Sequence, residues 1–202
     1  VQHPSLPAMP TPRRILIING HPDKESYSHA LAAAYSKGAL ASGAEVQEIV
    51  VADLAFDPIL RFGYRKQMDL EPDLQEAWAK ILWAQHLVWV YPVWWAGLPA
   101  LLKGFIDRLF LPGRAFKKRP GSLLCDKYMK GRSAHLISTM DQPVVYYWLM
   151  NRRPTYWAMK RNTLEFCGIK PVRTTIGPIR LSTDDFRAKW LLRVERLGAR
   201  RS

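Results

Sequence analysis

An uncharged stretch of 22 residues, from 81 to 102, constrains the fold more than any other part of this chain. A run of this length raises the question of a membrane-spanning helix. Its backbone, however, is interrupted at Pro92 and Gly97, and Pro99 suits the first position of a new helix. Residues 86–91, before these breaks, form a short run rich in residues that favour strands. We therefore interpret the stretch as a strand, a loop and a helix, and expect no membrane span.

The strand at 86–91 is apolar on both faces, which is typical of a central strand in a parallel sheet covered by helices. The loop at 92–97 follows its carboxyl end and carries Trp94 and Trp95. In open α/β sheets, ligands bind at the carboxyl ends of the strands. The two tryptophans either bind a flat aromatic ligand or are ordinary core or interface residues, and this stretch alone does not decide between these alternatives.

The rest of the chain alternates between strand and helix patterns. Strands are predicted at 14–19, 45–51, 86–91, 133–139 and 170–178. Helices are predicted at 30–40, 73–84, 99–110, 145–167 with an interruption at Pro154, and from 184 to about 197. Residues 111–132 are predicted to form a long basic loop with room for a short ribbon. This alternation predicts an α/β fold with a doubly wound, five-stranded parallel sheet and helices on both faces.

Residues 13–202 are predicted to form one domain, and residues 1–12, which contain four prolines, a mobile extension. The pair Arg13-Arg14 precedes only four apolar residues, which is too few for a secretory signal. Cys125 and Cys167 lie far apart and match neither a disulfide framework nor a metal-binding spacing. We therefore expect a cytoplasmic protein without a metal site.

The formal net charge of +13 is unevenly distributed. Residues 1–102 contain 8 lysines and arginines and 10 acidic residues, whereas residues 103–202 contain 22 and 7. Such a basic half attracts anions, either nucleic acid, a membrane surface or a phosphorylated cofactor, or it serves only as a solubilising face. No zinc-finger spacing or RNP-like motif accompanies the basic residues, so we do not expect nucleic acid as a partner.

The loop after the first predicted strand combines polar side chains with the start of a helix. His21, Ser26 and Ser28 lie in this loop, and either serine can cap the helix that follows. A helix N-terminus presents unpaired backbone N–H groups and so favours an anion. The spacing fits an anion site or merely a capped loop, because neither a Walker motif nor a GxGxxG motif is present.

Taken together, four segments resemble the flavodoxin-like NAD(P)H:quinone oxidoreductase family, which includes the DT-diaphorase-like and modulator-of-drug-activity-like flavoproteins. The segments that carry the resemblance are 16–22 with 26–28, 91–104, 138–139 and 166–168. They occur in the family's order within residues 14–197. The resemblance implies a flavin at the carboxyl ends of the strands, which accepts a hydride from a nicotinamide and passes it to a quinone-like acceptor.

The resemblance also assigns residues to that site. The flavin phosphate and ribityl chain would be contacted by His21, Ser26, Tyr27 and Ser28. The ring would lie along Pro92, Val93, Trp94 and Trp95, beside the hydroxyl pair of Ser138 and Thr139. Arg187 matches a position that touches adenine in members that use FAD, which favours FAD over FMN, although a surface arginine is the alternative.

Two positions carry the expected catalysis, and two depart from the family pattern. Tyr146 matches the tyrosine that closes the substrate pocket and donates to charge on the reduced ring, and Arg152 replaces the histidine that follows it. Met140 and Asp141 stand where well-studied members have two glycines. A carboxylate at that position disfavours negative charge on the ring unless it points away.

The resemblance thus predicts a homodimer that makes two-electron reductions of quinones or similar electrophiles with NADPH or NADH by a ping-pong mechanism. The subunit interface would include Trp148, Tyr156 and Trp157. The basic residues from 114 to 132 are expected to bind the NADPH phosphates, which would explain part of the uneven charge. One alternative is a nucleotide- and redox-sensing regulatory subunit on the same fold, of the potassium-efflux ancillary type. Another is an anion-binding module with a vestigial flavin site.

Overall fold

The computed structural model describes residues 12–122 and 124–200. Its centre is a five-stranded parallel sheet with the strand order β2-β1-β3-β6-β7. The strands are β1 (Arg14–Asn19), β2 (Glu45–Val50), β3 (His86–Pro92), β6 (Ser133–Thr139) and β7 (Lys170–Ile176). This arrangement confirms the prediction of a doubly wound sheet, and β3 lies at its centre as expected. The expected mobile extension falls almost wholly on residues 1–11, outside the described residues.

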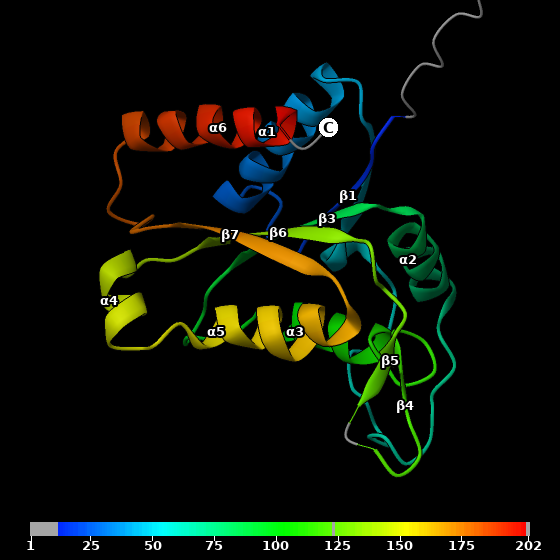
Figure 1. The fold of residues 1–202 in the computed structure, drawn as a ribbon. Helices are drawn as coiled ribbons and strands as arrows, with labels where there is room; N and C mark the ends of the chain where they lie inside the picture. Colours follow the sequence, from blue (N-terminus) through cyan, green and yellow to red (C-terminus); the bar gives the residue numbers. More distant parts are fainter. Residues whose placement is uncertain (1–11, 123, 201–202) are drawn as a thin grey trace, which may run out of the picture.

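Helices cover both faces of the sheet (Figure 1). One face carries α1 (Tyr27–Ala41) and α6 (Asp184–Ala199). The other carries α2 (Pro72–Trp83), α3 (Ala100–Leu109), α5 (Pro154–Trp157) and a π-helix (Ala158–Glu165). A short 3-10 helix (Val51–Asp53) follows β2, and α4 (Val144–Leu149) follows β6 at the edge of the molecule. No helix in the described part of the chain has the length and apolar character needed to cross a membrane.

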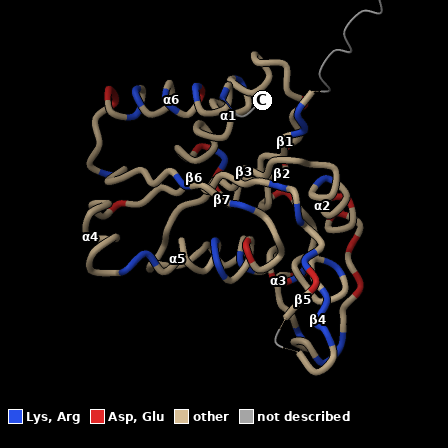
Figure 2. Tube along the Cα trace, viewed as in Figure 1, with Lys and Arg blue, Asp and Glu red and all other residues tan. Residues whose placement is uncertain are grey.

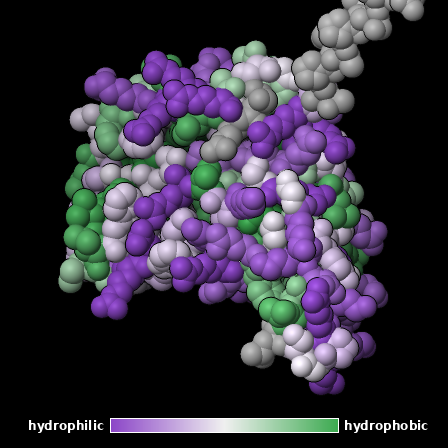
Figure 3. Space-filling view, viewed as in Figure 1, coloured by the Kyte–Doolittle hydropathy of each residue, from purple (hydrophilic) through white to green (hydrophobic). Residues whose placement is uncertain are grey.

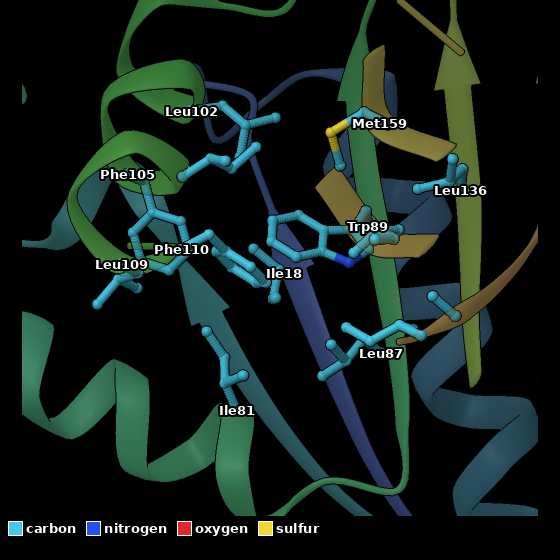
Figure 4. Close-up of a cluster of buried hydrophobic side chains, with 14 of the residues drawn as sticks. Ile18, Ile81, Leu87, Trp89, Leu102, Phe105, Leu109, Phe110, Leu136 and Met159 are labelled. Carbon is cyan, nitrogen blue, oxygen red and sulfur yellow. The ribbon is translucent and has the colours of Figure 1, made fainter. Parts of the chain in front are cut away.

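The sheet separates two hydrophobic cores. Alternate side chains of β3 enter opposite cores, as strand geometry requires, so Trp89 packs on one side and Val88 on the other. Trp89 is fully buried, and its ring lies 6.5 Å from that of Phe105 and 6.0 Å from that of Phe110 (Figure 4). Every residue of β3 is buried, which explains why the strand lacks a polar face.

Two long segments differ in detail from the predictions. The predicted helix at 145–167 is divided into α4, α5 and the π-helix, because Arg152 and Arg153 adopt left-handed backbone conformations with φ of 55° and 58°. Pro154 disfavours a helical conformation at the residue before it and then begins α5. The basic loop at 111–132 contains a short ribbon, an alternative that the sequence analysis left open. It is formed by β4 (Phe116–Lys118) and β5 (Cys125–Lys127) in antiparallel pairing.

A buried arginine fixes the connection between β2 and α2. The Arg108 side chain is 1% exposed and donates to both carboxylate oxygens of Glu71, at 3.0 and 2.8 Å. It also donates to the backbone carbonyls of Asp57 and Asp69. A buried cation requires such pairing, so Arg108 holds a segment that has little regular structure of its own against α3.

Candidate functional site

Loops from the carboxyl ends of β1, β3 and β6 converge on one pocket of about 320 Å³. A fourth segment, after β7, adds Ile179. Parallel strands end at the same edge of the sheet, which brings together loops that are far apart in the sequence. The pocket is lined by His21, Tyr27, Ser28, Pro92, Val93, Trp94, Trp95, Thr139, Met140, Asp141 and Ile179. Eight of the residues predicted for a flavin site are among them.

The loop after β1 holds His21 in one tautomer. The backbone N–H of His21 donates to Asn19 Oδ1 at 3.0 Å, and that of Asp23 donates to His21 Nδ1 at 3.0 Å. Because Nδ1 accepts a hydrogen bond, the neutral ring carries its proton on Nε2. Burial lowers the pKa of His21, an effect that the charge of Asp23 opposes. The ring meets Trp94 edge to face at 5.4 Å.

The N-terminus of α1 has the properties of an anion site. Ser26 is the N-cap residue, but its side chain makes no capping hydrogen bond. Its buried Oγ has no hydrogen-bond partner among the described residues. The His29 N–H donates to the Ser26 carbonyl at 3.0 Å, which leaves the N–H groups of Tyr27 and Ser28 without a partner within the helix. A phosphate group would satisfy them. Ser26 itself does not line the pocket, although Tyr27 and Ser28, which follow it, do.

Tyr27 and Ser28 are held differently. The Tyr27 hydroxyl donates to the backbone carbonyl of Arg187 at 2.7 Å, and burial raises the pKa of Tyr27 to about 12. Tyr27 therefore stays a neutral donor and ties α1 to α6 beside the pocket. Ser28 is buried, and its Oγ lies 3.4 Å from Thr139 Oγ1, which connects the first loop to the end of β6.

The loop after β3 forms a tight turn at 94–97. Trp94 and Gly97 exchange backbone hydrogen bonds of 3.1 and 2.8 Å. Between them, Trp95 and Ala96 adopt left-handed conformations with φ of 49° and 56°, which costs residues with a Cβ atom about 1–2 kcal/mol each. The Trp95 side chain is fully exposed beside the pocket, rather than sealed in the core. Such strain at a site loop is typical of a functional position.

A buried threonine supports this turn from α5. Thr155 is 2% exposed, and its hydroxyl donates to the backbone carbonyl of Ala96. Our sequence analysis missed Thr155, because no local pattern links it to a turn 59 residues away. The contact places α5 and the turn in fixed relation at the mouth of the site.

Only one member of the predicted hydroxyl pair lines the pocket. Thr139 does so, whereas the Ser138 hydroxyl lies 3.4 Å from that of Thr175 on β7. Successive side chains of a strand point to opposite faces, so the two hydroxyls diverge. Ser138 therefore lies outside the pocket lining, and its contact with a flavin ring stays a prediction. Asp141 also lines the pocket, and its Oδ1 accepts a hydrogen bond of 3.0 Å from the backbone N–H of Arg180.

Three further predicted residues lie outside the pocket lining. Tyr146 is half exposed on α4, and Arg152 is exposed just beyond that helix. The Arg187 guanidinium donates to Ser182 Oγ at 2.9 Å and to the backbone carbonyl of Ile179 at 3.2 Å. Arg187 therefore braces the loop that supplies Ile179 and does not itself reach the pocket. Sequence reasoning missed Ile179, because the segment after β7 has no motif.

A larger hollow of about 760 Å³ lies away from these loops, between α3, the β4–β5 ribbon and the π-helix. Its lining includes Phe110, Phe116 and Phe166. Of its charged residues, Lys103 and Asp107 pair with each other at 2.7 Å, and Lys118 comes from the ribbon. We place the functional site at the strand ends, where the unpartnered Ser26 hydroxyl and the strained turn lie. No cluster of potential metal ligands occurs in the described part of the chain.

The chain belongs to the family described as having a flavodoxin-like fold, whose model matches residues 13–191. Its relatives include an uncharacterized NAD(P)H oxidoreductase of Haemophilus influenzae, 33% identical over 122 residues, which cover 57% of this chain and 60% of the relative. Another is NAD(P)H dehydrogenase (quinone) 1 of Cavia porcellus, 28% identical over 183 residues, which cover 78% and 66%. The chain thus spans less than two thirds of the length of these relatives.

Solved structures show the same fold. Smu.1420 from Streptococcus mutans UA159 matches with a TM-score of 0.75 at 26% identity, over 93% of this chain and 99% of that one. The NAD(P)H:quinone oxidoreductase from Methanothermobacter marburgensis matches with a TM-score of 0.80 at 21% identity, over 94% and 98%. These similarities agree with the strand order and confirm the flavodoxin-like fold.

Proposed function

We propose that the protein is a flavin-dependent NAD(P)H oxidoreductase that reduces quinones or similar electrophiles by two electrons. The observation that carries this proposal is that one pocket joins the aromatic turn at Trp94 and Trp95 to Tyr27 and Ser28, the first residues of α1. The N-cap residue of this helix, Ser26, lies outside the pocket lining and has a buried hydroxyl without a hydrogen-bond partner among the described residues. A phosphorylated ligand with a flat aromatic ring needs both features. The names of the relatives from Haemophilus influenzae and Cavia porcellus support the same chemistry.

The residues present fit a flavin. Ser26 and the first N–H groups of α1 would bind its phosphate, and His21 Nε2–H adds a donor beside them. The turn at 94–97 and Thr139 would hold the ring edge and exclude water from it. A bound flavin supplies hydride chemistry, and the protein's task is to position it and tune its electrostatics. The same pocket would receive the nicotinamide and the acceptor in turn, as a ping-pong mechanism requires.

Asp141 and Tyr146 would set the conditions for reduction. A carboxylate on the pocket wall disfavours additional negative charge in the bound ring. Asp141 is therefore expected to lower the reduction potential of the flavin. Tyr146 and Arg152 lie near the end of β6 but outside the pocket lining, so their roles in closing the pocket and stabilising charge require α4 to adjust when ligands bind.

The basic ribbon region supports NADPH as the reductant. Lys117 and Lys118 are exposed on β4, and Arg119 pairs with Asp126 at 2.6 Å. Lys117 and Lys118 would bind the additional phosphate of NADPH. Because Lys118 lines the larger hollow and not the pocket at the strand ends, this role requires that the phosphate lie away from the flavin ring. The preference for FAD over FMN rests only on the position of Arg187 in the sequence, because its guanidinium is bound to Ser182 and Ile179 and lies outside the pocket lining.

An apolar surface over α4 supports a homodimer. Its exposed side chains are Val145, Tyr146, Trp148, Leu149 and Met150. They lie at one edge of the molecule (Figure 3), near the end of β6. Contiguous apolar surface of this kind is typical of an interface, and a second copy of the chain would cover it beside the site.

The test begins with the absorption spectrum of the purified protein. We expect a yellow protein that bleaches with NADPH and recovers its colour when menadione is added, and the mass of the released flavin distinguishes FAD from FMN. Yellow protein without turnover would instead support a redox-sensing regulatory subunit. Colourless protein that takes up no added flavin and retains polyanions would overturn the proposal in favour of an anion-binding module.

A further inference from the structure

The outward face of α6 is a row of cations. Lys189, Arg193, Arg196 and Arg200 recur at intervals of four, three and four residues, so they lie on one side of the helix and at its C-terminal end. All four are exposed, and with Leu192 they line a shallow groove of about 540 Å³. We call these five residues the α6 basic face. Figure 2 shows basic residues recurring along the helix.

The opposite side of α6 is fixed against α1. Val194 and Gly198 are buried, and a Cβ atom on Gly198 would lie 2.2 Å from the backbone carbonyl oxygen of Tyr35. Gly38 on α1 makes an equally close approach to the backbone of Glu195. The two helices are therefore in backbone contact, and the α6 basic face points away from the body of the protein without contributing to this packing.

The arginines of the α6 basic face have no acidic partner in residues 12–122 and 124–200. Lys189 pairs with Asp185 at 2.6 Å, but both side chains are 73% exposed and the pair is readily exchanged. Glu195 is already bound to Lys37, at 3.0 Å. Arg193 stacks on the Trp190 ring at 4.6 Å, which leaves its positive charge without a counter-charge. Three like charges on one helix face repel one another, so an anionic surface that contacts this face would relieve their repulsion.

We propose that the α6 basic face docks on a membrane surface that contains anionic phospholipid. Leu192 lies among the cations and is 56% exposed, and Leu181, in the loop before the helix, is 83% exposed. A helix lying in the interface presents apolar side chains to the acyl boundary while its cations contact the headgroups. Sequence-specific binding of nucleic acid fits less well, because this face offers neither an exposed aromatic ring nor an amide side chain to read bases. Binding through phosphates alone would leave the exposed Leu192 and Leu181 without a role.

This docking would also orient the proposed site. The segment between β7 and α6 supplies Ile179 to the pocket wall and Leu181 to the surface next to the helix. A membrane bound along α6 therefore lies beside one wall of the pocket and on the side of the molecule opposite the β4–β5 ribbon (Figure 1). A quinone dissolved in that membrane would then have access to the pocket, and this consequence rests on the proposed function. The docking itself does not.

The test is sedimentation of the full chain with vesicles, in the presence and absence of flavin. We expect binding to vesicles made of equal parts phosphatidylglycerol and phosphatidylcholine, and none to phosphatidylcholine alone. Each cation is worth on the order of 1 kcal/mol at an anionic surface, or about fivefold, so Arg193→Gln with Arg196→Gln should weaken binding about 25-fold. Leu192→Ser should weaken it with the charge unchanged.

A matched control is Arg65→Gln with Lys66→Gln, which removes two exposed cations from the segment between β2 and α2. It should bind vesicles as the unaltered protein does. An equal loss in this control, full binding by the α6 variant, or tighter retention on duplex DNA than on vesicles at the same salt would each overturn the proposal. Because binding is measured without turnover, a protein that docks but reduces nothing would refute the proposed function alone.

Discussion

Replacing Thr155 with valine tests whether the turn at 94–97 is built for ligand binding. Valine keeps the shape of the side chain but removes the hydroxyl that donates to the Ala96 carbonyl. A buried acceptor left without its donor costs about 1–3 kcal/mol, and the half-buried Ala96 carbonyl falls toward the lower end of this range. The two left-handed residues of the turn store about 2–4 kcal/mol, a comparable amount, so loss of this hydrogen bond releases the turn toward unstrained conformations.

This free-energy cost should appear as weaker flavin binding, because binding must return the turn to its strained conformation. We expect Thr155→Val to weaken binding of flavin to the apoprotein about tenfold, which corresponds to about 1.4 kcal/mol. Quenching of flavin fluorescence during titration measures this affinity. The chain contains eight tryptophans, so the emission of Trp95 is obtained as the difference between each protein and the same protein with Trp95→Phe. This emission reports the conformation of the turn before flavin is added, because Trp95 is fully exposed there.

Two control variants separate positioning from a general loss of stability. Thr155→Ser keeps the hydroxyl and should bind flavin as the unaltered protein does. Thr163→Val removes a hydroxyl that donates to the Ala158 carbonyl at 3.0 Å within the π-helix, and should leave flavin affinity unchanged. If Thr155→Val binds flavin normally, or if Thr163→Val weakens binding equally, the turn is not held for its ligand by Thr155.

Three further predictions address other parts of the molecule. Glu71→Gln should lower the free energy of unfolding in urea by about 3 kcal/mol, the low end of the range for breaking a buried ion pair, because the Glu71 side chain is 29% exposed while that of Arg108 is 1% exposed. Burial opposes ionisation of Glu71, but hydrogen bonds from Arg108 and from backbone N–H groups keep its pKa below the usual value. The stability that ionised Glu71 contributes is therefore present above the unfolded-state pKa and should be lost as pH falls through the folded-state pKa. Asp141→Asn should raise the flavin reduction potential in a dye-coupled titration, and an unchanged potential would mean that the carboxylate points away from the ring. Lys117→Gln with Lys118→Gln should raise KM for NADPH more than for NADH, and equal changes would contradict phosphate binding by the ribbon.

The sequence predicts the sheet well because its signals are local. Each strand is a short apolar run, and the breaks at Pro92 and Pro99 mark the loop that carries the tryptophans. The sequence also contained a constraint that our prediction overlooked. Side chains alternate along a strand, so adjacent Ser138 and Thr139 must point to opposite faces of the sheet. The strained turn was not predictable, because Trp95 and Ala96 lack the glycine that usually marks left-handed backbone.

Contacts between distant segments account for what the sequence did not reveal. Thr155 reaches Ala96 across 59 residues, and Arg108 reaches Glu71 across 37. Both depend on how α3 and α5 lie against the sheet, which no single segment encodes. The division of the helix at 145–167 was signalled by Pro154, but the left-handed residues before it and the π-helix after it depend on tertiary packing.

The turn at 94–97 lowers the stability of the fold in a segment that would bind the ligand. Its left-handed positions carry an indole and a methyl group where glycine would relieve the steric conflict, and the indole lies in solvent and so adds nothing to the cores. Directed evolution for thermal stability alone should therefore replace Trp95 early. The resulting proteins should be more stable but should bind an aromatic ligand less tightly. Retention of tryptophan there under such selection would mean that the ring has a stabilising partner outside a single copy of the chain.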